Sequence, residues 1–390
     1  MTTLRVIVDQ LVAPVPGNLG RYTEELTRAL IRTAPSGCDV EGIVSASSSA
    51  QYSHIERVLP GLARLSKTTL PRRELAAAWQ LGITAPLGPG MIHAPGLLAP
   101  LRRHDRDRDG SQVAVTVHDV LAWTHPESLT PATVAGTKLM LKRARKHADA
   151  VVVPSHALAD QLAEIADFGD RVRVIGGAVG EGLRLPIGSL DPESADARAI
   201  VSARVRALGL PPQYILTSGT LDPRKAVTSL VTALGLPGAP DLPLVVLGPD
   251  SWGELHVASV ADEAGLPEDR VLPLSGLSDE DLAVVISRAA VFVYPSLEEG
   301  FGLPVIQAFQ LGTPVIHSDA PALVEASGDA ALVVPRDDAA GYPQRLADAL
   351  TRVLADDRLA ERLSIIGSDR AKAFSWNDSA ERVWQLHADL

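Results

Sequence analysis

Short apolar runs alternate with amphipathic segments along most of the chain, and this alternation restricts the fold more than any other feature of the sequence. The clearest runs are residues 4–8, 113–117, 150–153, 214–218, 244–247, 291–294 and 314–317. A strand that is apolar on both faces is typical of a parallel sheet covered by helices on both sides. The amphipathic segments that would supply such helices include residues 21–32, 131–147 and 196–208. We therefore predict an α/β protein with two doubly wound domains.

The domain boundary is expected where prolines and a glycine interrupt this pattern. A chain of 390 residues allows two to three domains. Residues 183–197 contain two prolines and a glycine and are expected to act as a linker. We predict a first domain over residues 1–190 and a second over 196–375. Residues 376–390 carry apolar side chains at helical spacing, so they are expected to form a helix that crosses back onto the first domain.

The composition excludes several classes of protein. Hydrophobic residues make up 46% of the chain and charged residues 21%, which is typical of a folded globular protein. Residues 1–200 hold 22 Lys and Arg against 21 Asp and Glu, and residues 201–390 hold 14 against 26, so neither half has the basic excess of a nucleic-acid-binding protein. The single cysteine, Cys38, cannot form an internal disulfide. No signal sequence or unbroken apolar span stands out, so we expect a cytoplasmic enzyme acting on small molecules.

The first candidate site lies between the opening strand and the helix at 21–32. Its residues are Gly17, Asn18, Leu19 and Gly20. Glycines at a helix N-terminus let free N–H groups approach an anion. The same residues also fit an ordinary strand-to-helix turn. They lack the G-x-G-x-x-G spacing of dinucleotide-binding proteins, which disfavours a dehydrogenase.

A second candidate is His118, which follows the apolar run at 113–117 together with Asp119. Ligands of open α/β sheets collect at the carboxyl ends of the strands, where His118 would lie. A single histidine is also common as a purely structural residue, so this position alone does not define a site.

A third candidate follows the run at 214–218, beginning at Gly219. Asp222 is expected to cap a helix that starts at the next residue, a proline. Arg224 and Lys225 then place two cations beside that helix N-terminus, where positive charge is unfavourable unless an anion compensates it. A bound phosphate would explain the arrangement, and so would two solvated charges tolerated at a small cost.

The fourth candidate is an acidic, glycine-containing loop that follows the run at 291–294. It contains Glu298 and Glu299 and leads into a helix opened by Pro304. Because helical side chains lean toward the N-terminus, Gln307 is expected to point back toward Glu299. The two polar groups would then converge on one crevice, although glutamates in loops are also common as solubilising charges.

Together these segments resemble the family 4 retaining glycosyltransferases, whose GT-B architecture has two Rossmann-like domains facing across a cleft. Residues 217–225 resemble the strand and G-x-x-x-x-R-K loop of the family, and residues 299–312 resemble its E-G-F-G-L-P signature. Residues 17–22 resemble its glycine loop, and residues 115–119 resemble its strand ending in His-Asp. The resemblance covers nearly the whole chain and is strongest in the second half.

The resemblance implies a hexosyltransferase that binds a nucleotide sugar mainly through its second domain, without a metal or other cofactor. Arg224 and Lys225 would hold the donor diphosphate. Glu299 would contact the sugar hydroxyls, and His118 would reach the sugar from the first domain; these two are the candidate catalytic residues. The other expected donor contacts are Gly17, Asn18, Leu19, Gly20, Gly219, Gly302, Leu303 and Gln307.

Gln307 departs from the E-x7-E pattern of the family, in which a second glutamate is assigned to the ribose hydroxyls. A carboxylate accepts from two hydroxyls, whereas an amide offers one acceptor oxygen and an NH2 donor. We expect a loss on the order of 1 kcal/mol, roughly tenfold in donor affinity. The substitution puts the nucleotide preference in question.

Acceptor binding is expected in the first domain, where cations concentrate. Lys138, Lys142 and Arg145 would share one face of the predicted helix at 131–147. Such a basic helix suits a carbohydrate acceptor linked to a lipid at the inner membrane face. It also fits an ordinary solvated helix face.

These features predict transfer of a sugar, with retention, from a nucleoside diphosphate to a hydroxyl of a glycan, glycolipid or other acceptor. The pattern G-N-x-G-R-Y-T-x-E-L from Gly17 resembles members that transfer mannose or rhamnose. GDP-mannose is therefore the first donor to consider, with dTDP- and UDP-sugars as alternatives. A nucleotide-sugar 2-epimerase and a catalytically inactive partner subunit stay open, the latter because of Gln307.

Overall fold

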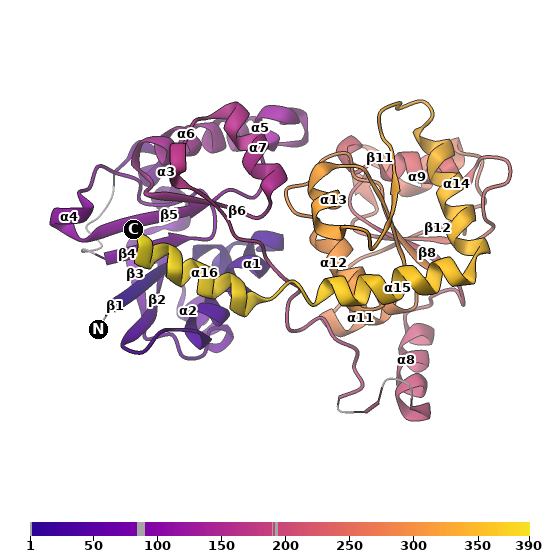
Figure 1. Ribbon diagram of the computed structural model, residues 1–390, viewed down its shortest axis with the longest axis horizontal. Helices are drawn as coiled ribbons and strands as arrows, with labels where there is room; N and C mark the ends of the chain where they lie inside the picture. Colours follow the sequence, from indigo (N-terminus) through magenta and orange to yellow (C-terminus); the bar gives the residue numbers. More distant parts are fainter. Residues whose placement is uncertain (1, 84–89, 189, 192–193) are drawn as a thin grey trace. The chain divides into compact units, whose positions relative to one another are not determined.

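The computed structural model describes residues 2–83, 90–188, 190–191 and 194–390. The chain divides into two compact units, Met1–Ala178 with Ser375–Leu390, and Val179–Phe374 (Figure 1). The division falls earlier than residue 190, where we expected the first domain to end. Leu183, the first residue of the expected linker, is fully buried in the core of the second unit, so the linker begins as part of that unit. Residues 189, 192 and 193 of the linker lie outside the described residues.

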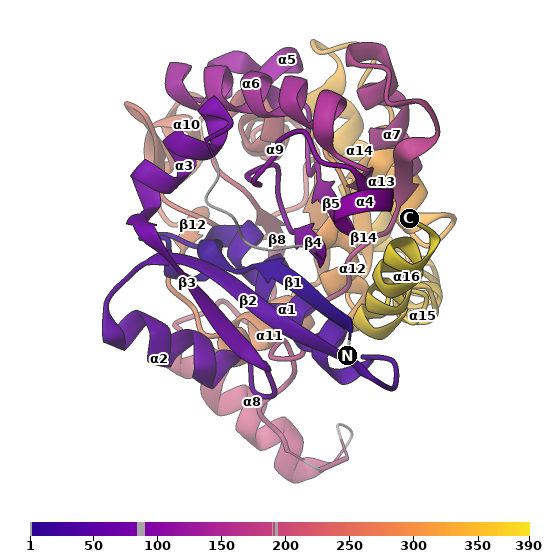
Figure 2. The same cartoon turned by 90° about the vertical axis from the view of Figure 1, so that its left-hand side faces the viewer.

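The first unit is built on a seven-stranded sheet in the order β3-β2-β1-β4-β5-β6-β7, and every neighbouring pair is parallel. The strands are β1 (Thr2–Ile7), β2 (Cys38–Ala46), β3 (Arg64–Pro71), β4 (Gly90–Ala94), β5 (Ser111–Thr116), β6 (Ala150–Val153) and β7 (Val172–Val174). The helices are α1 (Gly17–Arg32), α2 (Ser49–Val58), α3 (Arg72–Leu81), α4 (Arg106–Asp109), α5 (Leu121–Thr124), α6 (Pro131–His147), α7 (His156–Ile165) and α16 (Trp376–Asp389). Figure 2 shows β1, β2 and β3 side by side.

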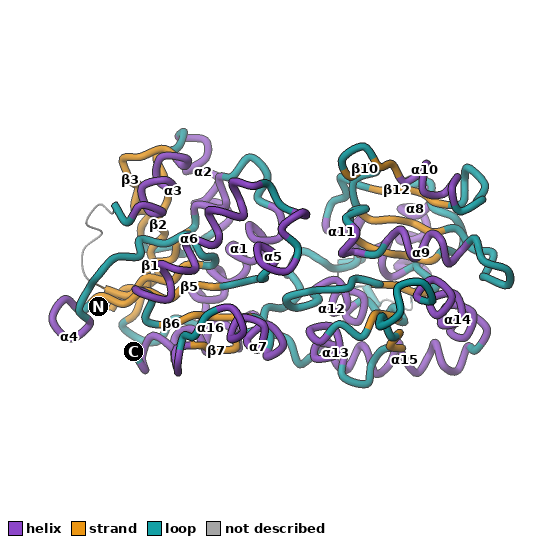
Figure 3. The backbone as a smooth tube through the Cα atoms, turned by 90° about the horizontal axis from the view of Figure 1, so that it is seen from above, coloured by secondary structure: helices purple, strands orange, loops and turns teal. Residues whose placement is uncertain are grey.

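The second unit has a six-stranded parallel sheet in the order β12-β9-β8-β13-β14-β15. The strands are β8 (Ile215–Ser218), β9 (Leu244–Leu247), β12 (Val271–Leu274), β13 (Val291–Tyr294), β14 (Val315–Ser318) and β15 (Leu332–Val334). The helices are α8 (Ala195–Ala207), α9 (Val227–Leu234), α10 (Val257–Glu263), α11 (Asp279–Ser287), α12 (Leu303–Gln310), α13 (Pro321–Ser327), α14 (Tyr342–Ala355) and α15 (Asp357–Ala371). A two-stranded hairpin, β10 (Ser251–Trp252) and β11 (Leu255–His256), precedes α10. Helices flank these strands in Figure 3.

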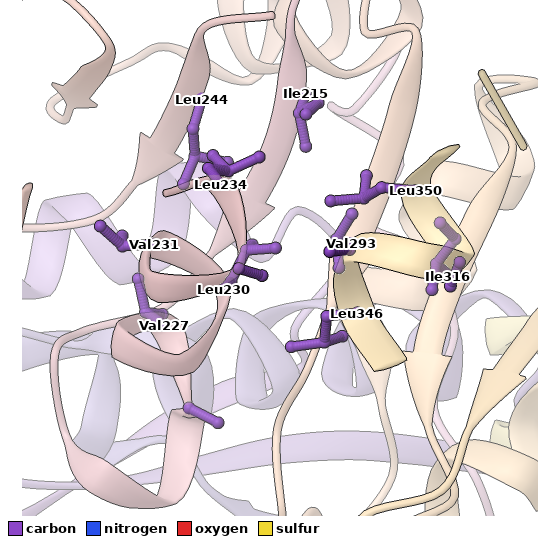
Figure 4. Packing of buried hydrophobic residues seen from close by; sticks show 14 of the residues in the cluster. Ile215, Val227, Leu230, Val231, Leu234, Leu244, Val293, Ile316, Leu346 and Leu350 are labelled. Atoms are coloured by element: carbon purple, nitrogen blue, oxygen red, sulfur yellow. The ribbon is translucent and has the colours of Figure 1, made fainter. Parts of the chain in front are cut away.

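Side chains of the second sheet alternate between two buried cores. Ile215 packs with α9 and α14 on one face, whereas Leu216 packs with α11 and α12 on the other. Figure 4 shows the first of these cores, where Leu230 and Leu234 of α9 and Leu350 of α14 lie around the strands. Because both faces are covered, the strands show no alternation of polar and apolar residues. The expected fold class, two doubly wound parallel α/β domains, is confirmed.

Both sheets reverse their strand order at one point, between β1 and β4 in the first unit and between β8 and β13 in the second. At such a point the connections from the two strands leave in opposite directions and open a crevice beyond their carboxyl ends, where ligands of α/β proteins bind. A ligand site is therefore expected in the segments that follow β1, β4, β8 and β13.

The last helix, α16, belongs to the first unit and lies beside α1 (Figure 1). The indole N–H of Trp384 donates to the carbonyl of Leu30 at 3.1 Å. The hydroxyl of Ser379 donates to the carbonyl of Gly176 at 2.7 Å. The structure therefore places this helix where the spacing of its apolar residues suggested.

Candidate functional site

The predicted residues of the second unit meet where its sheet reverses. A turn from Gly219 leads from β8 into a short 3-10 helix, η4 (Pro223–Lys225), and the loop with Glu299 follows β13. These two strands pair directly, although they are far apart in the sequence. Arg224, Lys225 and Glu299 therefore lie at one edge of the sheet.

The local conformation around η4 is set by its flanking residues. The carboxylate of Asp222 accepts a hydrogen bond from the backbone N–H of Arg224 at 3.0 Å, so the predicted cap is present. It caps η4 and not the longer helix α9. Ala226 separates the two helices with a φ of 49°, a left-handed value that is unusual for a residue with a side chain.

Glu299 lies at the centre of a cluster of cations. The ammonium of Lys225 donates to Oε1 of Glu299 and, at 3.0 Å, to the hydroxyl of Tyr294. Nη1 of Arg224 lies 3.5 Å from the same Oε1 and donates to the backbone carbonyl of Glu298 at 2.9 Å. The side chains of Arg224, Lys225 and Glu299 are 11%, 17% and 13% exposed. Glu299 is therefore a member of a built ionic cluster and is not a solubilising loop charge.

The positive charge of this cluster is balanced within the protein. Glu299 pairs with both cations, and Oδ2 of Asp222 lies 3.7 Å from Nη2 of Arg224. From the sequence we had expected either a phosphate or solvent to compensate Arg224 and Lys225. Nε of Arg224 is nevertheless buried without a hydrogen-bond partner among the described residues. An unsatisfied buried donor costs about 1–3 kcal/mol, so a rearrangement that gave this N–H an acceptor would be stabilising.

Two hydroxyls hold the carboxylate of Glu299. Ser296 donates to Oε1 at 2.6 Å and Tyr294 donates to it at 2.8 Å. Burial acts to raise the pKa of Glu299, but Lys225, Ser296 and Arg224 hold that pKa below its usual range. Burial and the carboxylate of Glu299 raise the pKa of Tyr294 well above 10. Glu299 is thus an ionised acceptor, and Tyr294 stays a donor.

Sequence reasoning did not assign a role to Tyr294 or Ser296. The available signal was the hydroxyl of Tyr294 at the end of an otherwise apolar strand, with Ser296 two residues later. A second layer supports them: the hydroxyl of Ser318, on β14, donates to the carbonyl of Ser296. His317, next to it, bonds Ser327 at 2.7 Å. The position of Glu299 therefore depends on two neighbouring strands.

Two glycines let the strand ends approach closely. A Cβ at Gly248, which follows β9, would lie 2.3 Å from the carbonyl oxygen of Gly219. Gly219 itself has a φ of 146° and lies against the side chain of Lys225. Gly248 was not among the predicted site residues, because its constraint comes from a neighbouring strand and not from a local motif.

The helix that follows the Glu299 loop, α12, starts at Leu303. Gly302 precedes it with a φ of 89°, and a Cβ there would lie 2.6 Å from Cδ2 of Leu323. Only glycine fits both conditions. The side chain of Gln307 makes no hydrogen bond with Glu299 or with any other described residue. That the two side chains converge on one crevice stays a prediction.

In the first unit the structure corrects the start of the first helix. α1 begins at Gly17 and not at residue 21, because the backbone N–H of Gly20 donates to the carbonyl of Pro16 at 2.9 Å and closes the first turn there. The first turn of the helix therefore contains Gly17, Asn18, Leu19 and Gly20. A short 3-10 helix that the sequence did not predict, η1 (Asp9–Val12), fills the path from β1. A Cβ at Gly20 would lie 2.3 Å from Cβ of Pro16, so packing requires this glycine.

His118 follows β5 at the carboxyl edge of the first sheet. Its Nε2 lies 2.6 Å from the carbonyl oxygen of Pro95, which follows β4. A carbonyl only accepts, so Nε2 carries the proton. Burial lowers the pKa of His118, against the opposing effect of the Pro95 carbonyl. The ring is therefore neutral near pH 7, with Nδ1 as an acceptor. Tyr22 packs against it at 4.5 Å between ring centroids.

The basic helix α6 has the predicted bounds, Pro131–His147. Lys138, Lys142 and Arg145 are exposed on it, and Nζ of Lys138 lies 5.8 Å from the ring centroid of Trp123. Within the part of the chain that the structure describes, no helix combines the length and the hydropathy needed to cross a bilayer.

Comparison with known proteins agrees with this geometry. The family model described as Glycosyltransferase Family 4 matches residues 19–180, and the model described as Glycosyl transferases group 1 matches residues 203–370. One relative is the O-antigen chain mannosyltransferase B of Escherichia coli, 35% identical over 168 residues, which are 42% of this chain and 43% of that enzyme. Another is the D-inositol 3-phosphate glycosyltransferase of a Nocardioides strain, 28% identical over 97% of this chain and 87% of its own length.

Among solved structures, HepE of Anabaena, crystallised with UDP and glucose, is 15% identical and superimposes with a TM-score of 0.72 over 100% of both chains. That likeness shows the fold. The matched part of this chain covers less than half the length of the first mannosyltransferase. Because one family model matches each of the two α/β units, the chain belongs to the family 4 glycosyltransferases of GT-B architecture.

Proposed function

We propose that this protein transfers a sugar, with mannose as the first candidate, from a nucleoside diphosphate sugar to an acceptor hydroxyl. The observation that carries the proposal is the buried cluster of Arg224, Lys225 and Glu299 where the second sheet reverses. The relative from Escherichia coli is named a mannosyltransferase, and HepE was crystallised with UDP and glucose. The first name supports mannose as the sugar, and the second supports a nucleotide-sugar donor.

The chemistry of the cluster suits a diphosphate leaving group. When the bond from the anomeric carbon to the diphosphate breaks, negative charge builds on the leaving oxygen. Fixed cations at that point stabilise the transition state more than the bound donor. Lys225 and the unpartnered Nε of Arg224 supply such cations in a site that is largely closed to water. We propose that the diphosphate takes over part of the pairing that Glu299 now makes.

Glu299 would then be available to the sugar. Ser296 and Tyr294 hold its carboxylate in place, and its lowered pKa keeps it ionised near neutral pH. An ionised carboxylate accepts hydrogen bonds from two sugar hydroxyls, which orients the ring. Glu299 is proposed here as the group that selects and positions the sugar.

Retention of the anomeric configuration is proposed from the family resemblance. The acceptor oxygen bonds to the anomeric carbon on the face that the diphosphate leaves, and the acceptor proton passes to the departing phosphate oxygen. The products are the glycosylated acceptor and a nucleoside diphosphate. No residue of this chain gains or loses a proton over the whole step.

The first test is thermal stabilisation by GDP, UDP, dTDP and ADP. A ligand that binds only the folded protein at 100 times its Kd stabilises it by about 2.7 kcal/mol. One nucleotide should stand out, and the matching nucleotide sugar should then yield nucleoside diphosphate only when an acceptor is present. Conversion of the donor to another nucleotide sugar without acceptor would show an epimerase. Binding without turnover over a broad acceptor panel would show an inactive subunit.

Variants assign the response to the cluster. Lys225→Ala should abolish most of the stabilisation, whereas Lys372→Ala removes the same charge from an exposed lysine of the same unit and should not. Glu299→Gln keeps the shape and should retain nucleotide binding while lowering kcat. Melting of each unliganded variant is measured first, because removing one partner of a buried ion pair destabilises the fold. Wild-type binding and kcat in the well-folded cluster variants would refute the site.

A further inference from the structure

A basic cavity lies in the first unit, away from the residues that carry the proposed function. Its volume is about 510 Å³, within the range of small-molecule sites. The basic side chains that line it are Arg102, Arg103, Arg106, Lys146, Arg171 and Arg173. The acidic ones are Asp149, Asp170 and Asp389. Cations remain in excess by two even when a carboxylate at Leu390 is counted.

The cavity lies at the amino edge of the sheet. Asp149 directly precedes β6, Arg171 directly precedes β7, and Arg102 lies in the segment before β5. Figure 2 views the first unit from this edge, with α4 and the end of α16 in front. His118 lies beyond the opposite end of β5, and a strand of six residues spans about 20 Å. The cavity is therefore separate from the carboxyl edge, where His118 and the first turn of α1 lie.

Asp149, one of the acidic residues that line the cavity, already has partners within the protein. Oδ2 of Asp149 accepts from Nε2 of His104 at 2.7 Å and from the backbone N–H of Val113 at 2.8 Å. Nε of Arg106 lies 3.9 Å from its other oxygen. Asp149 is thus committed to holding the segment before β5 against the start of β6.

Two of the arginines, Arg171 and Arg173, already donate hydrogen bonds to backbone carbonyls. Arg171 donates to the carbonyls of Phe168, Ala148 and Arg145 at 2.8–3.0 Å, which uses all three of its nitrogen atoms. Arg173 donates to the carbonyl of Val172 at 3.0 Å. These side chains add positive charge but are held by the backbone.

Three other cations that line the cavity have no such hydrogen bonds among the described residues. Arg102, Arg103 and Lys146 are exposed at the cavity, and none of the described residues forms a hydrogen bond or ion pair with their side chains. Like charges that converge without counter-ions repel one another, so an anion at this place would be stabilising. Most of the lining residues are charged, which disfavours an apolar ligand.

We propose that this cavity is a second anion site of the protein, which binds a phosphate-bearing ligand through Arg102, Arg103 and Lys146. Planar guanidinium groups bind phosphate oxygens in pairs, and an ammonium adds a point charge. The ligand is either a soluble phosphate compound or the phosphate headgroup of a lipid. Both carry the same chemistry, and the experiment separates them.

The probe is inorganic pyrophosphate, titrated calorimetrically into the full chain. Because pyrophosphate can also enter the Arg224 and Lys225 cluster, Lys225→Ala is the background, with Arg224→Ala as a second background if the first does not fold. Pyrophosphate should bind either background. Adding Arg103→Ala with Lys146→Ala should weaken binding at least about tenfold. Arg73→Ala, which removes the same charge from α3 outside the cavity, should change it less than about twofold.

The second arm is sedimentation with vesicles of phosphatidylglycerol and phosphatidylcholine, compared with phosphatidylcholine alone. Binding to the anionic vesicles that pyrophosphate displaces, and that the Arg103 and Lys146 substitutions remove, assigns the lipid headgroup. Pyrophosphate binding without vesicle binding assigns a soluble ligand. The proposal is overturned if the substituted cavity binds like the unsubstituted one, if Arg73→Ala weakens binding equally, or if neither probe binds.

Discussion

A pair of buried histidines makes the first unit sensitive to acid. His93, on β4, is fully buried, and neither of its ring nitrogens has a hydrogen-bond partner among the described residues. Its ring lies 5.6 Å from that of His387, on α16, which is 2% exposed. Nδ1 of His387 lies 3.3 Å from the side-chain oxygen of Gln112. The contact joins the C-terminal helix to the centre of the sheet.

The sign and size of the effect follow from the pKa values. Burial, reinforced by the nearby His387, lowers the pKa of His93 to about 3. Burial lowers the pKa of His387 to about 4, against a smaller opposing effect of Asp149. An unfolded histidine has a pKa of about 6.5, so below this pH the unfolded chain binds protons that the folded chain does not. The stability is fully present above pH 6.5 and is lost as the pH falls toward 4.

At pH 5 both folded pKa values still lie below the ambient pH, so the loss depends only on the unfolded value. This pH lies about 1.5 units below the unfolded pKa, and each unit lowers the unfolding free energy by about 1.4 kcal/mol per histidine. The pair therefore accounts for a loss of about 4 kcal/mol. His104 acts in the opposite direction, because its hydrogen bond to Asp149 raises its pKa. A comparison of variants isolates the pair from His104.

The assay is urea unfolding at pH 7.5 and pH 5, followed by tryptophan fluorescence. Four of the five tryptophans, Trp79, Trp123, Trp376 and Trp384, belong to the first unit. His93→Leu should reduce the acid loss of unfolding free energy by about 2 kcal/mol relative to wild type. His156→Leu, at an exposed histidine of the same unit, is the control and should leave the loss unchanged. If His93→Leu and wild type lose the same free energy, burial does not set the protonation of His93.

Three further predictions concern the site and the docking of α16. Gly248→Ala places a methyl group against the carbonyl of Gly219. The unfolding free energy should therefore fall by about 1–3 kcal/mol, and nucleotide binding should weaken. Unchanged melting and binding would contradict this. Gln307→Glu restores a second carboxylate and should tighten binding of the preferred nucleotide roughly tenfold by calorimetry, and no change would show that Gln307 does not contact the nucleotide. Trp384→Phe removes the donor to the Leu30 carbonyl and should cost about 1–2 kcal/mol in urea unfolding, whereas Trp123→Phe, on α5, serves as the comparison.

The sequence predicted the fold class because apolar runs for strands and amphipathic spacing for helices are both local features of the chain. Continuous apolar runs gave strands within about two residues of their observed bounds, and the basic helix at 131–147 was predicted at its observed bounds. The first helix starts four residues earlier than predicted, because one proline and two glycines at 16–20 indicate a loop in the sequence but form the start of the helix. The linker was placed late for a different reason: Leu183 is buried by contacts that are distant in the sequence.

The candidate site of the second unit was predicted as two separate motifs, and the direct pairing between their side chains was not predicted. The pairing of Glu299 with Lys225 depends on β8 and β13 being neighbours, which the chain order does not reveal. For the same reason the sequence did not reveal that Glu299, 74 positions away, pairs with Lys225. Tyr294 was assigned only to a strand, because one partner of its hydroxyl, Lys225, lies across that same junction.

Charge is arranged differently at the amino edge of the first sheet and at the point where the second sheet reverses its strand order. The difference determines what kind of anion each place suits. Around Glu299 the cations and carboxylates balance, so an incoming diphosphate must compete with a protein carboxylate and binds only where its geometry is better. At the amino edge of the first sheet, Asp149 is engaged by His104 and three cations stay uncompensated. That edge would attract anions with little selectivity, and its affinity should fall steeply with salt. A balanced site suits recognition of one donor, whereas an unbalanced site suits attachment to a phosphate-bearing ligand or surface.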